Sequence, residues 1–255
     1  MTQNLLSRDV MTKRHLHSYP EASHHTKLKV MIQIPCWNEE AYLPIALRDL
    51  PKSIPGVSEL AILVVDDGST DGTSRVAKEN GITHLIRFDH HKGLAQAFSA
   101  GLRYALDWGA DIIINTDADN QYSARHIPDL IRPILEDRAD FVIGTRPIEE
   151  ISDFSWLKKR LQKTGSWFIG KISGTGVKDA TSGFRACNRR TALLMNIVST
   201  YTYTVETILL AGRHNLRLHE GPVSVNPKLR DSRLARSSWD YLLRSSHSLL
   251  KSYLL

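Results

Sequence analysis

Cysteine is scarce in this sequence. Its 255 residues include only two, Cys36 and Cys187. Two thiols are too few for the disulfide framework of a small secreted domain, and also too few for a zinc site built from cysteines alone. Because the scarcity favours a reducing compartment, we expect a cytoplasmic protein.

Long apolar runs are also absent. The longest uninterrupted stretches, such as residues 60–65, have the length of a strand, whereas a membrane-spanning helix needs about 18 or more apolar residues in a row. No charged-then-apolar signal peptide is visible. With 42% hydrophobic and 24% charged residues, the composition predicts a globular protein and excludes a collagen-like or wholly disordered chain.

Acidic residues are outnumbered, with 27 Asp and Glu against 33 Lys and Arg and a formal net charge of +6. A basic excess favours anionic partners, but it does not choose between nucleic acid, phosphorylated metabolites and an acidic membrane surface. The excess lies in the second half of the chain, where residues 151–173 hold five basic side chains and one acid. The acidic clusters lie in the first half.

The chain divides into three segments by pattern. Residues 1–27 lack apolar periodicity and hold four of the 11 histidines, so we expect a flexible tail. Residues 28–233 are expected to form one domain. In residues 234–255 the apolar and basic side chains fall on different faces of a helix. Such an amphipathic helix suits a membrane interface, and it equally suits packing against the domain or a second copy of the chain.

Strand-like and helix-like stretches alternate up to about residue 146. Short β-rich runs lie at residues 29–34, 60–66, 82–88, 111–115 and 141–144. Helical patterns lie between them, at residues 39–50, 71–80, 94–106 and 127–135. Repeated βα units predict an α/β fold with a mostly parallel central sheet flanked by helices on both faces. Ligands of such sheets bind beyond the carboxyl ends of the strands, so we expect the chemistry there.

The fourth expected strand ends at Asp117 and Asp119, the only Asp-x-Asp of the chain. Residues two apart on an extended segment face the same way, so both carboxylates can reach one hard cation. Mg²⁺ and Mn²⁺ take oxygen ligands and are commonly shared with substrate phosphates. The motif therefore predicts a divalent-metal site, with a metal-free turn as the alternative.

The second expected strand ends in Asp66 and Asp67, followed by a Gly-Ser-Thr-Asp-Gly run. Acidic residues, glycine and a Ser or Thr cap are normal in a turn that connects a strand to the following helix. Paired carboxylates at this position are equally suited to accept hydrogen bonds from a ribose or a base. Both interpretations stay open at this point.

Arginine and lysine recur downstream, at Arg146, in residues 158–163 and in residues 230–233, and a polar loop lies at residues 179–185. A charge run is usually a solvated helix face. Arginine, however, binds phosphate through a planar pair of hydrogen bonds. Several arginines beside an acidic metal site indicate an anionic substrate.

Taken together, these blocks resemble a family 2 glycosyltransferase with the GT-A fold, in its polyprenyl-phosphate or dolichol-phosphate sugar transferase branch. The resemblance rests on six segments in order: residues 34–40, 66–71, 117–121, 144–146, 179–185 and 230–233. Three positions depart from the family pattern: Trp37 replaces the usual Tyr, Asn120 replaces Gly or Leu, and the Arg-Asp-Ser-Arg run is tighter than the common motif.

The resemblance implies a Rossmann-like nucleotide-binding half, a UDP- or GDP-linked sugar donor, a lipid phosphate acceptor and Mg²⁺ or Mn²⁺. The nucleotide would be held by Pro35, Trp37, Glu39, Asp66, Asp67, Asp117 and Ala118. The metal would be held by Asp117, Asp119 and Gln121. The acceptor phosphate would be held by Arg146, Arg160 and Thr164, and the donor diphosphate would be covered by Arg230, Ser232 and Arg233.

Asp119, Arg146 and Asp179 are the expected catalytic residues. A phosphate monoester has a second pKa of about 6, so a lipid phosphate is already an oxyanion near neutral pH and needs positioning more than deprotonation. In-line attack by it would invert the anomeric centre. If the acceptor were a hydroxyl group, a general base would be required, and Asp179 would be the candidate.

Proteins of other classes fit less well. A nucleic-acid-binding protein would explain the charge, but no recognition helix rich in base-reading residues is visible. A dehydrogenase would need a Gly-x-Gly-x-x-Gly after the first strand, and a sugar nucleotidyltransferase a glycine-rich loop, where Trp37-Asn38-Glu39-Glu40 stands. A non-enzymatic membrane-surface protein stays a second alternative. We expect a peripheral enzyme on the cytoplasmic face of a membrane, with a homo-oligomer possible and no nucleic-acid partner.

Overall fold

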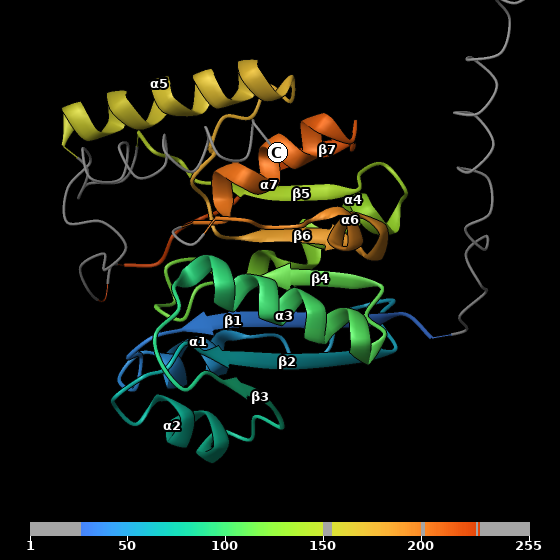
Figure 1. The fold of residues 1–255 in the computed structure, drawn as a ribbon. Helices are drawn as coiled ribbons and strands as arrows, with labels where there is room; N and C mark the ends of the chain where they lie inside the picture. Colours follow the sequence, from blue (N-terminus) through green and yellow to red (C-terminus); the bar gives the residue numbers. More distant parts are fainter. Residues whose placement is uncertain (1–26, 150–154, 200–201, 228, 230–255) are drawn as a thin grey trace, which may run out of the picture.

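A seven-stranded sheet forms the centre of the computed structural model, which describes residues 27–149, 155–199, 202–227 and 229 (Figure 1). The strand order is β3-β2-β1-β4-β6-β5-β7. The strands are β1 (Lys29–Cys36), β2 (Glu59–Asp66), β3 (His84–Arg87), β4 (Ile112–Asn115), β5 (Phe141–Thr145), β6 (Arg185–Asn188) and β7 (Leu218–Pro222). The expected tail, the Arg230 to Arg233 segment and the expected C-terminal helix lie outside the described residues.

The sheet is mostly parallel, as the alternating pattern predicts. β1 pairs in parallel with β2 and β4, β2 with β3, and β5 with β7. β6 alone is antiparallel to its neighbours, β4 and β5. The chain enters β6 from the loop at residues 179–184, which lies at the carboxyl edge of β4 and β5. Because β6 begins at that edge, it runs antiparallel to β4 and β5. The loop that precedes β6 therefore lies at the expected site.

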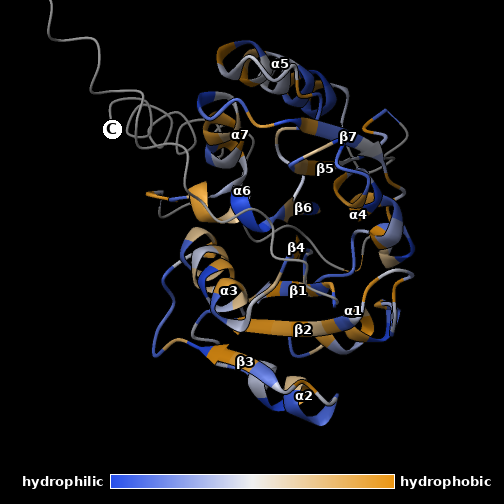
Figure 2. Cartoon of the chain, turned by 90° about the vertical axis from the view of Figure 1, so that its right-hand side faces the viewer, coloured by the Kyte–Doolittle hydropathy of each residue, from blue (hydrophilic) through white to orange (hydrophobic). Residues whose placement is uncertain are grey.

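Helices cover both faces of the sheet, so each central strand is buried on both sides (Figure 2). Met31 packs into one core with α3 and α7, while its neighbour Ile32 packs into the other with α1 and α4. This alternation is the two-residue period of a strand. The helices are α1 (Leu43–Asp49), α2 (Thr73–Glu79), α3 (Leu94–Trp108), η1 (Ala124–His126), α4 (Ile127–Leu135), α5 (Trp156–Ser173), α6 (Arg189–Leu194) and α7 (Thr204–Arg213).

Two helices begin later than their patterns predict. α1 begins at Leu43 instead of residue 39, and α2 begins at Thr73 instead of residue 71. In both cases a preceding acid bonds the loop instead of extending the helix. Asp71 Oδ1 accepts the Thr73 amide at 2.9 Å, and Glu40 Oε2 accepts the Gly72 amide at 3.0 Å. The residues before these helices therefore form the loops that carry the expected site.

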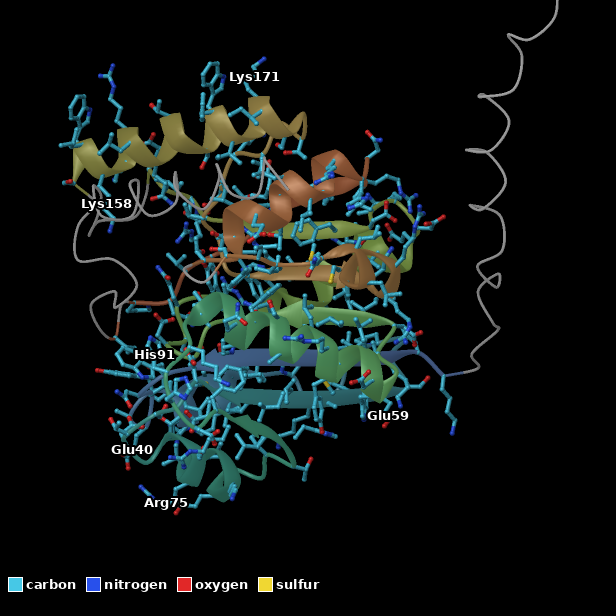
Figure 3. The ribbon with its side chains drawn as sticks, in the orientation of Figure 1. Glu40, Glu59, Arg75, His91, Lys158 and Lys171 are labelled. Carbon is cyan, nitrogen blue, oxygen red and sulfur yellow. The ribbon has the colours of Figure 1, made fainter. Side chains whose placement is uncertain are left out.

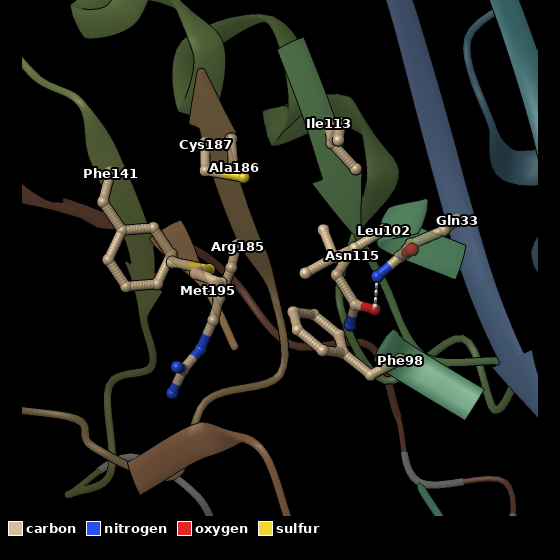
Figure 4. Close-up of a pocket in the computed structure, with 10 residues that line it drawn as sticks. All are labelled: Gln33, Phe98, Leu102, Ile113, Asn115, Phe141, Arg185, Ala186, Cys187 and Met195. Carbon is tan, nitrogen blue, oxygen red and sulfur yellow. Dashed lines mark hydrogen bonds between the residues drawn. The ribbon is translucent and has the colours of Figure 1, made fainter. Parts of the chain in front are cut away.

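A small internal space lies between β1, β4, β6 and α3 (Figure 4). It has room for about one water molecule and is lined mainly by apolar core side chains such as Phe98 and Met195. Gln33 Nε2 donates to Asn115 Oδ1 across it at 3.1 Å. This space belongs to the packing of the core and is too small for a substrate. No helix of the described residues is long and apolar enough to cross a membrane.

Candidate active site

Two loops meet at the carboxyl ends of β1 and β2, and hydrogen bonds fasten them together. Figure 3 shows Glu40 and His91 at the end of the molecule to which these strands point. Three backbone amides of the first loop donate to side chains of the second: Asn38 N to Ser69 Oγ at 2.9 Å, Glu39 N to Thr73 Oγ1 at 2.8 Å, and Glu40 N to Asp71 Oδ2 at 3.1 Å. The polar side chains of the second loop therefore hold the two loops together as a rigid edge.

The paired acids after β2 have different roles. Asp66 is fully buried and accepts hydrogen bonds from the Ser69 amide, at 2.9 Å, and from the Ser74 hydroxyl. Its carboxylate caps the turn, which is the structural interpretation of this motif. Asp67 instead reaches across to the loop before α3, where the amides of Lys92 and Gly93 donate to its two oxygens at 2.7 and 2.9 Å.

Trp37 is the exposed aromatic residue at this edge. Its side chain has a stacking partner, because the His91 ring lies against it with centroids 4.2 Å apart and 24° between the planes. His91 Nδ1 also lies 2.9 Å from Asp67 Oδ2. The structure thus brings the expected base-binding residues Trp37 and Asp67 together, with His91 between them. The sequence pattern gave no signal for His91.

Pro35, Glu39 and Ala118, also expected at the nucleotide, are buried at the same edge. Pro35 pairs with Val65 within the sheet, and the Glu39 carbonyl accepts the amides that open α1. Pro35 and Glu39 therefore contribute to the backbone of the edge that carries Trp37 and Asp67.

The Asp-x-Asp loop follows β4 directly. Asp119 Oδ1 accepts the Gln121 amide at 3.1 Å, so a tight turn orients this carboxylate. Asn120 has φ of 55°, a left-handed conformation that Asn tolerates better than most residues. Asn226 fixes the turn from outside, because its side chain donates to the Asn120 carbonyl at 2.9 Å and its amide to the Gln121 carbonyl at 2.8 Å.

Gly183, in the loop before β6, lies directly against Asp117. A Cβ placed on Gly183 would lie 2.8 Å from Asp117 Oδ1, so a larger residue would have to displace the carboxylate or its own loop. The Gly183 amide donates to Tyr122 Oη at 3.0 Å, and its carbonyl accepts Asn115 Nδ2 at 2.8 Å. The loop at residues 179–185 is therefore held firmly against the Asp-x-Asp turn, as its expected place at the site requires.

Arg146 and Asp179 form a buried ion pair beside this turn. Arg146 Nε and Nη2 donate to the two Asp179 oxygens, both at 2.8 Å, and Nη2 also donates to Thr181 Oγ1 at 2.7 Å. Asp179 is fully buried and Arg146 is 8% exposed. Two expected catalytic residues thus lie together, and each is the other's principal partner.

The pKa values at this pair reflect burial and opposite charge. Burial alone would raise the pKa of Asp179, but the charge and hydrogen bonds of Arg146 outweigh it and hold that pKa below its ordinary value. The pKa of Arg146 is raised although burial opposes it, because the negative charge and the hydrogen bonds of Asp179 favour the charged guanidinium. Burial, together with the Asp117 and Asp179 charges, raises the pKa of Tyr122 to about 12, so this phenol stays neutral near pH 7.

Arg160 and Thr164 are exposed on α5. The Arg160 guanidinium lies over the Trp156 ring, 5.3 Å from its centroid. Their neighbour Gln162 connects α5 to the buried pair, because its side-chain amide donates to Thr181 Oγ1 at 2.7 Å. The structure therefore brings Arg146, Asp179 and Asp117 to one edge and leaves Arg160 and Thr164 on the outer face of the adjoining helix.

Several residues that organise the site carry only a weak sequence signal. Gln33 interrupts an apolar run in β1, and Asn115 ends the otherwise apolar β4; that contrast is the signal that marks them. Arg185 is fully buried, and it ties its loop to α7 by donating to the Ser182 and Thr204 carbonyls at 2.6 and 2.7 Å. Its role is thus structural.

Asp117 and Asp119 fit a divalent cation that is shared with a ligand. No cluster of three or more His, Cys, Asp or Glu within the described ranges forms a complete metal site. A cation on two carboxylates retains positions for water and phosphate oxygens, which is the usual way in which proteins hold Mg²⁺. Besides burial, the charges of Glu39, Asp66 and Asp117 raise the pKa of the Cys36 thiol. A cation would balance this concentration of negative charge.

The chain is similar in sequence to known glycosyltransferases. A family model described as Glycosyl transferase family 2 matches residues 31–194. The undecaprenyl-phosphate mannosyltransferase of Micrococcus luteus is 29% identical over 220 residues, which cover 82% of this chain and 88% of that protein. The UDP-N-acetylglucosamine–dolichyl-phosphate N-acetylglucosaminyltransferase of Methanococcus voltae is 27% identical over 216 residues, with 76% and 84% covered.

The fold is similar to that of a solved glycosyltransferase. Glucosyl-3-phosphoglycerate synthase from Mycobacterium tuberculosis, in complex with Mn²⁺, UDP and glucosyl-3-phosphoglycerate, superposes with a TM-score of 0.66. The two sequences are 18% identical, and the match covers 89% of this chain and 80% of the other. At this identity the likeness concerns the fold, and it confirms the expected GT-A architecture.

Proposed function

The chain belongs to glycosyl transferase family 2, and we propose that it moves a sugar from a nucleoside-diphosphate donor to a polyprenyl phosphate, with a divalent metal and inversion at the anomeric carbon. Membership of the family makes it a glycosyltransferase. The lipid phosphate acceptor is supported by the relatives from Micrococcus luteus and Methanococcus voltae, which are named for undecaprenyl and dolichyl phosphate.

The donor nucleotide is assigned to the edge built by the first two loops. Trp37 offers an indole face for a base, since aromatic rings stack favourably. Asp67 offers a carboxylate that the Lys92 and Gly93 amides already hold in place. Because these bonds orient the carboxylate in advance, less ordering of Asp67 is required when a ribose or base binds.

The donor diphosphate is assigned to the Asp-x-Asp turn, where Asp117 and Asp119 would hold Mg²⁺ or Mn²⁺. When bound, such a cation neutralises charge on a leaving diphosphate. The Gln121 amide orients one Asp119 oxygen, and Gly183 leaves room beside Asp117. The Asp119 carboxylate is thereby oriented before any ligand arrives. Arg230, Ser232 and Arg233 stay proposed as the residues that cover the diphosphate.

The Arg146–Asp179 pair is the observation that carries the choice of a phosphate acceptor. A general base needs an accessible oxygen and a pKa near the working pH. Asp179 has neither, because it is fully buried, both oxygens accept from Arg146, and its pKa is lowered. A lipid phosphate needs no base. It needs a fixed cation, and Asp179 holds Arg146 in one orientation.

Transfer is a single displacement in this proposal. A phosphate oxygen of the acceptor forms the bond to the anomeric carbon while the bond to the donor diphosphate breaks, and the electron pair leaves with the diphosphate. No proton has to move. Because attack and departure lie on opposite sides of the carbon, the configuration is inverted.

An acceptor comparison tests the proposal. The purified protein is incubated with Mn²⁺, a UDP- or GDP-sugar, and either a short-chain polyprenyl phosphate or the matching polyprenol. We expect sugar transfer to the phosphate alone. Transfer to the alcohol at a similar rate would overturn the phosphate assignment and would favour a hydroxyl-acceptor enzyme.

Thermal shift with UDP- and GDP-sugars, with and without Mn²⁺, tests the donor and the metal independently of the acceptor. A ligand that binds only the folded state raises the melting temperature. We expect a shift for one of the two nucleotides that depends on Mn²⁺ and is lost in Asp119→Asn. A shift that is independent of metal would contradict the assignment of Asp117 and Asp119.

A further inference from the structure

Gly183 lies directly against the Asp117 carboxylate, and two buried tyrosines bind its amide and its carbonyl. Tyr122 follows the Asp-x-Asp turn and is buried, and its Oη accepts the Gly183 amide at 3.0 Å. Tyr203 immediately precedes α7 and is fully buried, and its Oη donates to the Gly183 carbonyl at 3.3 Å. The two polar groups of one glycine are therefore bonded to tyrosines from different parts of the chain.

The two tyrosines belong to the two different cores of the protein. Tyr203 packs in the core that contains α3 and α7, where its ring stacks on Phe98 with centroids 3.8 Å apart and 2° between the planes. Tyr122 packs in the other core, where its ring stacks on Phe184 with centroids 5.3 Å apart. Gly183 is thus held from both faces of the sheet, by side chains that the cores themselves fix in place.

Asn115 connects this arrangement to β4, the strand that leads into the Asp-x-Asp turn. Its Nδ2 donates to the Gly183 carbonyl at 2.8 Å and to Tyr203 Oη at 2.7 Å. Its Oδ1 accepts from Gln33 on β1, as Figure 4 shows. The Asn115, Gln33 and Tyr203 side chains are all buried, and hydrogen bonds of a satisfied buried network hold their groups in one arrangement.

The position of Gly183 constrains the Asp117 carboxylate. A Cβ on Gly183 would lie 2.8 and 2.9 Å from the two Asp117 oxygens and 3.1 Å from Tyr203 Oη, so the glycine fills a narrow space between these two side chains. A shift of its backbone toward Asp117 would push the carboxylate aside, and a shift away would leave a gap beside it. Close-packed interiors transmit such displacements, so whatever holds Gly183 also holds Asp117.

We propose that Tyr122 and Tyr203, together called the tyrosine clamp, are positioning residues of the metal site: they hold Gly183 so that Asp117 keeps the orientation that Mg²⁺ or Mn²⁺ requires. The inference rests on the proposed function in one respect, the assignment of a divalent cation to Asp117. It does not depend on which sugar is transferred or on which acceptor receives it.

The orientation of a carboxylate ligand matters for these cations. Mg²⁺ demands nearly ideal octahedral geometry, so a misdirected oxygen lowers its affinity. Residues that orient metal ligands without touching the metal typically contribute ten- to hundredfold to metal affinity. Tyr203 acts on Asp117 through one further residue, Gly183, so we expect a smaller contribution of about fivefold.

Titration of the full chain with Mn²⁺ tests the tyrosine clamp without any sugar transfer. Free Mn²⁺ is measured by its electron paramagnetic resonance signal, with the protein alone and with saturating UDP or GDP. We expect Tyr203→Phe to weaken Mn²⁺ binding about fivefold. This substitution removes only the hydroxyl group, and the ring keeps its stack on Phe98. Tyr122→Phe should act in the same direction, and the double variant should bind Mn²⁺ more weakly than either.

Two controls distinguish positioning of the metal ligand from a general loss of stability. Tyr104→Phe removes a tyrosine hydroxyl that lies 2.9 Å from Nδ1 of His84, the first residue of β3. Ile208→Val shortens a fully buried side chain on α7, the helix that follows Tyr203, without removing a polar group. It should lower the melting temperature by about 2–4 °C. Both controls should bind Mn²⁺ as the wild type does, at a temperature at which circular dichroism shows every variant folded.

Each result decides for or against the tyrosine clamp. Weaker Mn²⁺ binding by Tyr203→Phe than by Ile208→Val would support it. Wild-type affinity in both tyrosine variants would overturn it and leave the metal assignment intact. Equal weakening in Ile208→Val would also overturn it, because the loss of affinity would then follow stability. If the wild type binds no Mn²⁺ with or without a nucleotide, the assignment of the cation to Asp117 is wrong, and the clamp is overturned with it.

Transfer assays give a second readout that a merely structural role would not change. The Mn²⁺ concentration for half-maximal rate should rise about fivefold in Tyr203→Phe, whereas the rate at saturating Mn²⁺ should stay within about twofold of the wild type. A lower rate at saturating Mn²⁺ with an unchanged Mn²⁺ requirement would overturn the proposal, because the hydroxyl would then act on something other than the metal ligand.

Discussion

The His91 imidazole stacks on the Trp37 indole with ring centroids 4.2 Å apart, and its Nδ1 lies 2.9 Å from Asp67 Oδ2. His91 thereby occupies two groups, an aromatic face and a carboxylate oxygen, that the proposed function assigns to the nucleotide. A base that stacks on this face of Trp37 has to displace the imidazole first. In the proposed site, His91 would therefore compete with the donor nucleotide.

We predict that His91→Ala binds its nucleoside diphosphate more tightly than the wild type. Removal of one stacking contact and one polar contact with Asp67 is worth about 1 kcal/mol, or several-fold in Kd. Isothermal titration with UDP and GDP in the presence of Mn²⁺ measures the change. Asp67 stays oriented by the Lys92 and Gly93 amides, so the rest of the edge is preserved. Weaker binding of the nucleotide by His91→Ala would instead indicate that His91 contributes to the nucleotide pocket.

Asp179→Asn should be strongly destabilising, because it removes the carboxylate that neutralises buried Arg146. Loss of one member of a buried pair costs about 3–5 kcal/mol. Urea unfolding measures this, with Glu136→Gln as a control, because the Glu136–Arg138 pair is about half exposed and worth little. Folded Asp179→Asn should still transfer sugar to lipid phosphate at a reduced rate. Complete loss of sugar transfer in well-folded Asp179→Asn would instead support Asp179 as a general base.

The Asp140–Arg217 pair gives the fold an acid-sensitive contribution. Hydrogen bonds from Arg217 are the main reason why the pKa of Asp140 lies below its ordinary value of 3.8, and burial opposes them. A carboxylate whose pKa is lowered by folding stabilises the fold at pH values above its pKa in the unfolded chain. This contribution is lost as the pH falls through its pKa in the folded protein. Asp140→Asn should therefore reduce the free energy of unfolding by a constant amount near neutrality, and by progressively less below about pH 4.

Denaturant titrations of both proteins across that pH range measure the difference. Asp129→Asn is the control, since Asp129 pairs with Arg132 at 3.2 Å on an exposed helix face, with 59% of its side chain accessible. Exposed pairs of this kind contribute little at any pH. A difference for Asp140→Asn that persists unchanged at pH 3 would show that the carboxylate charge is not the cause.

Much of the fold can be predicted from the sequence because buried parallel strands are continuous apolar runs. β2 and β4 lie almost where their runs predict, and α4 matches residues 127–135. The direction of β6 cannot be predicted in this way. It depends on the edge of the sheet from which the chain enters, and that is a property of the assembled sheet.

The site can be predicted only where its signal is local. Asp117 and Asp119 stand two apart after an apolar run, and that spacing is readable in the sequence. The Arg146–Asp179 pair joins residues 33 positions apart, and no periodicity connects them. For the same reason the inward turn of Asp66, which separates its role from that of Asp67, emerges only in the folded chain.

Gly183 provides the sharpest test of the assembled edge. A methyl group at this position would lie 2.8 Å from Asp117 Oδ1 and 3.1 Å from Tyr203 Oη, so Gly183→Ala must displace the carboxylate or its own loop. Misplacement by about 1 Å can cost a hundredfold in rate, and we expect a loss of that order together with a weaker Mn²⁺-dependent thermal shift. Gly165→Ala is the matched control, because a Cβ there meets nothing within 4 Å and the residue lies within α5. Alanine in a helix is favoured over glycine, so this control should keep full activity and gain a little stability. Unimpaired catalysis by Gly183→Ala would indicate that Asp117 takes no part in the reaction.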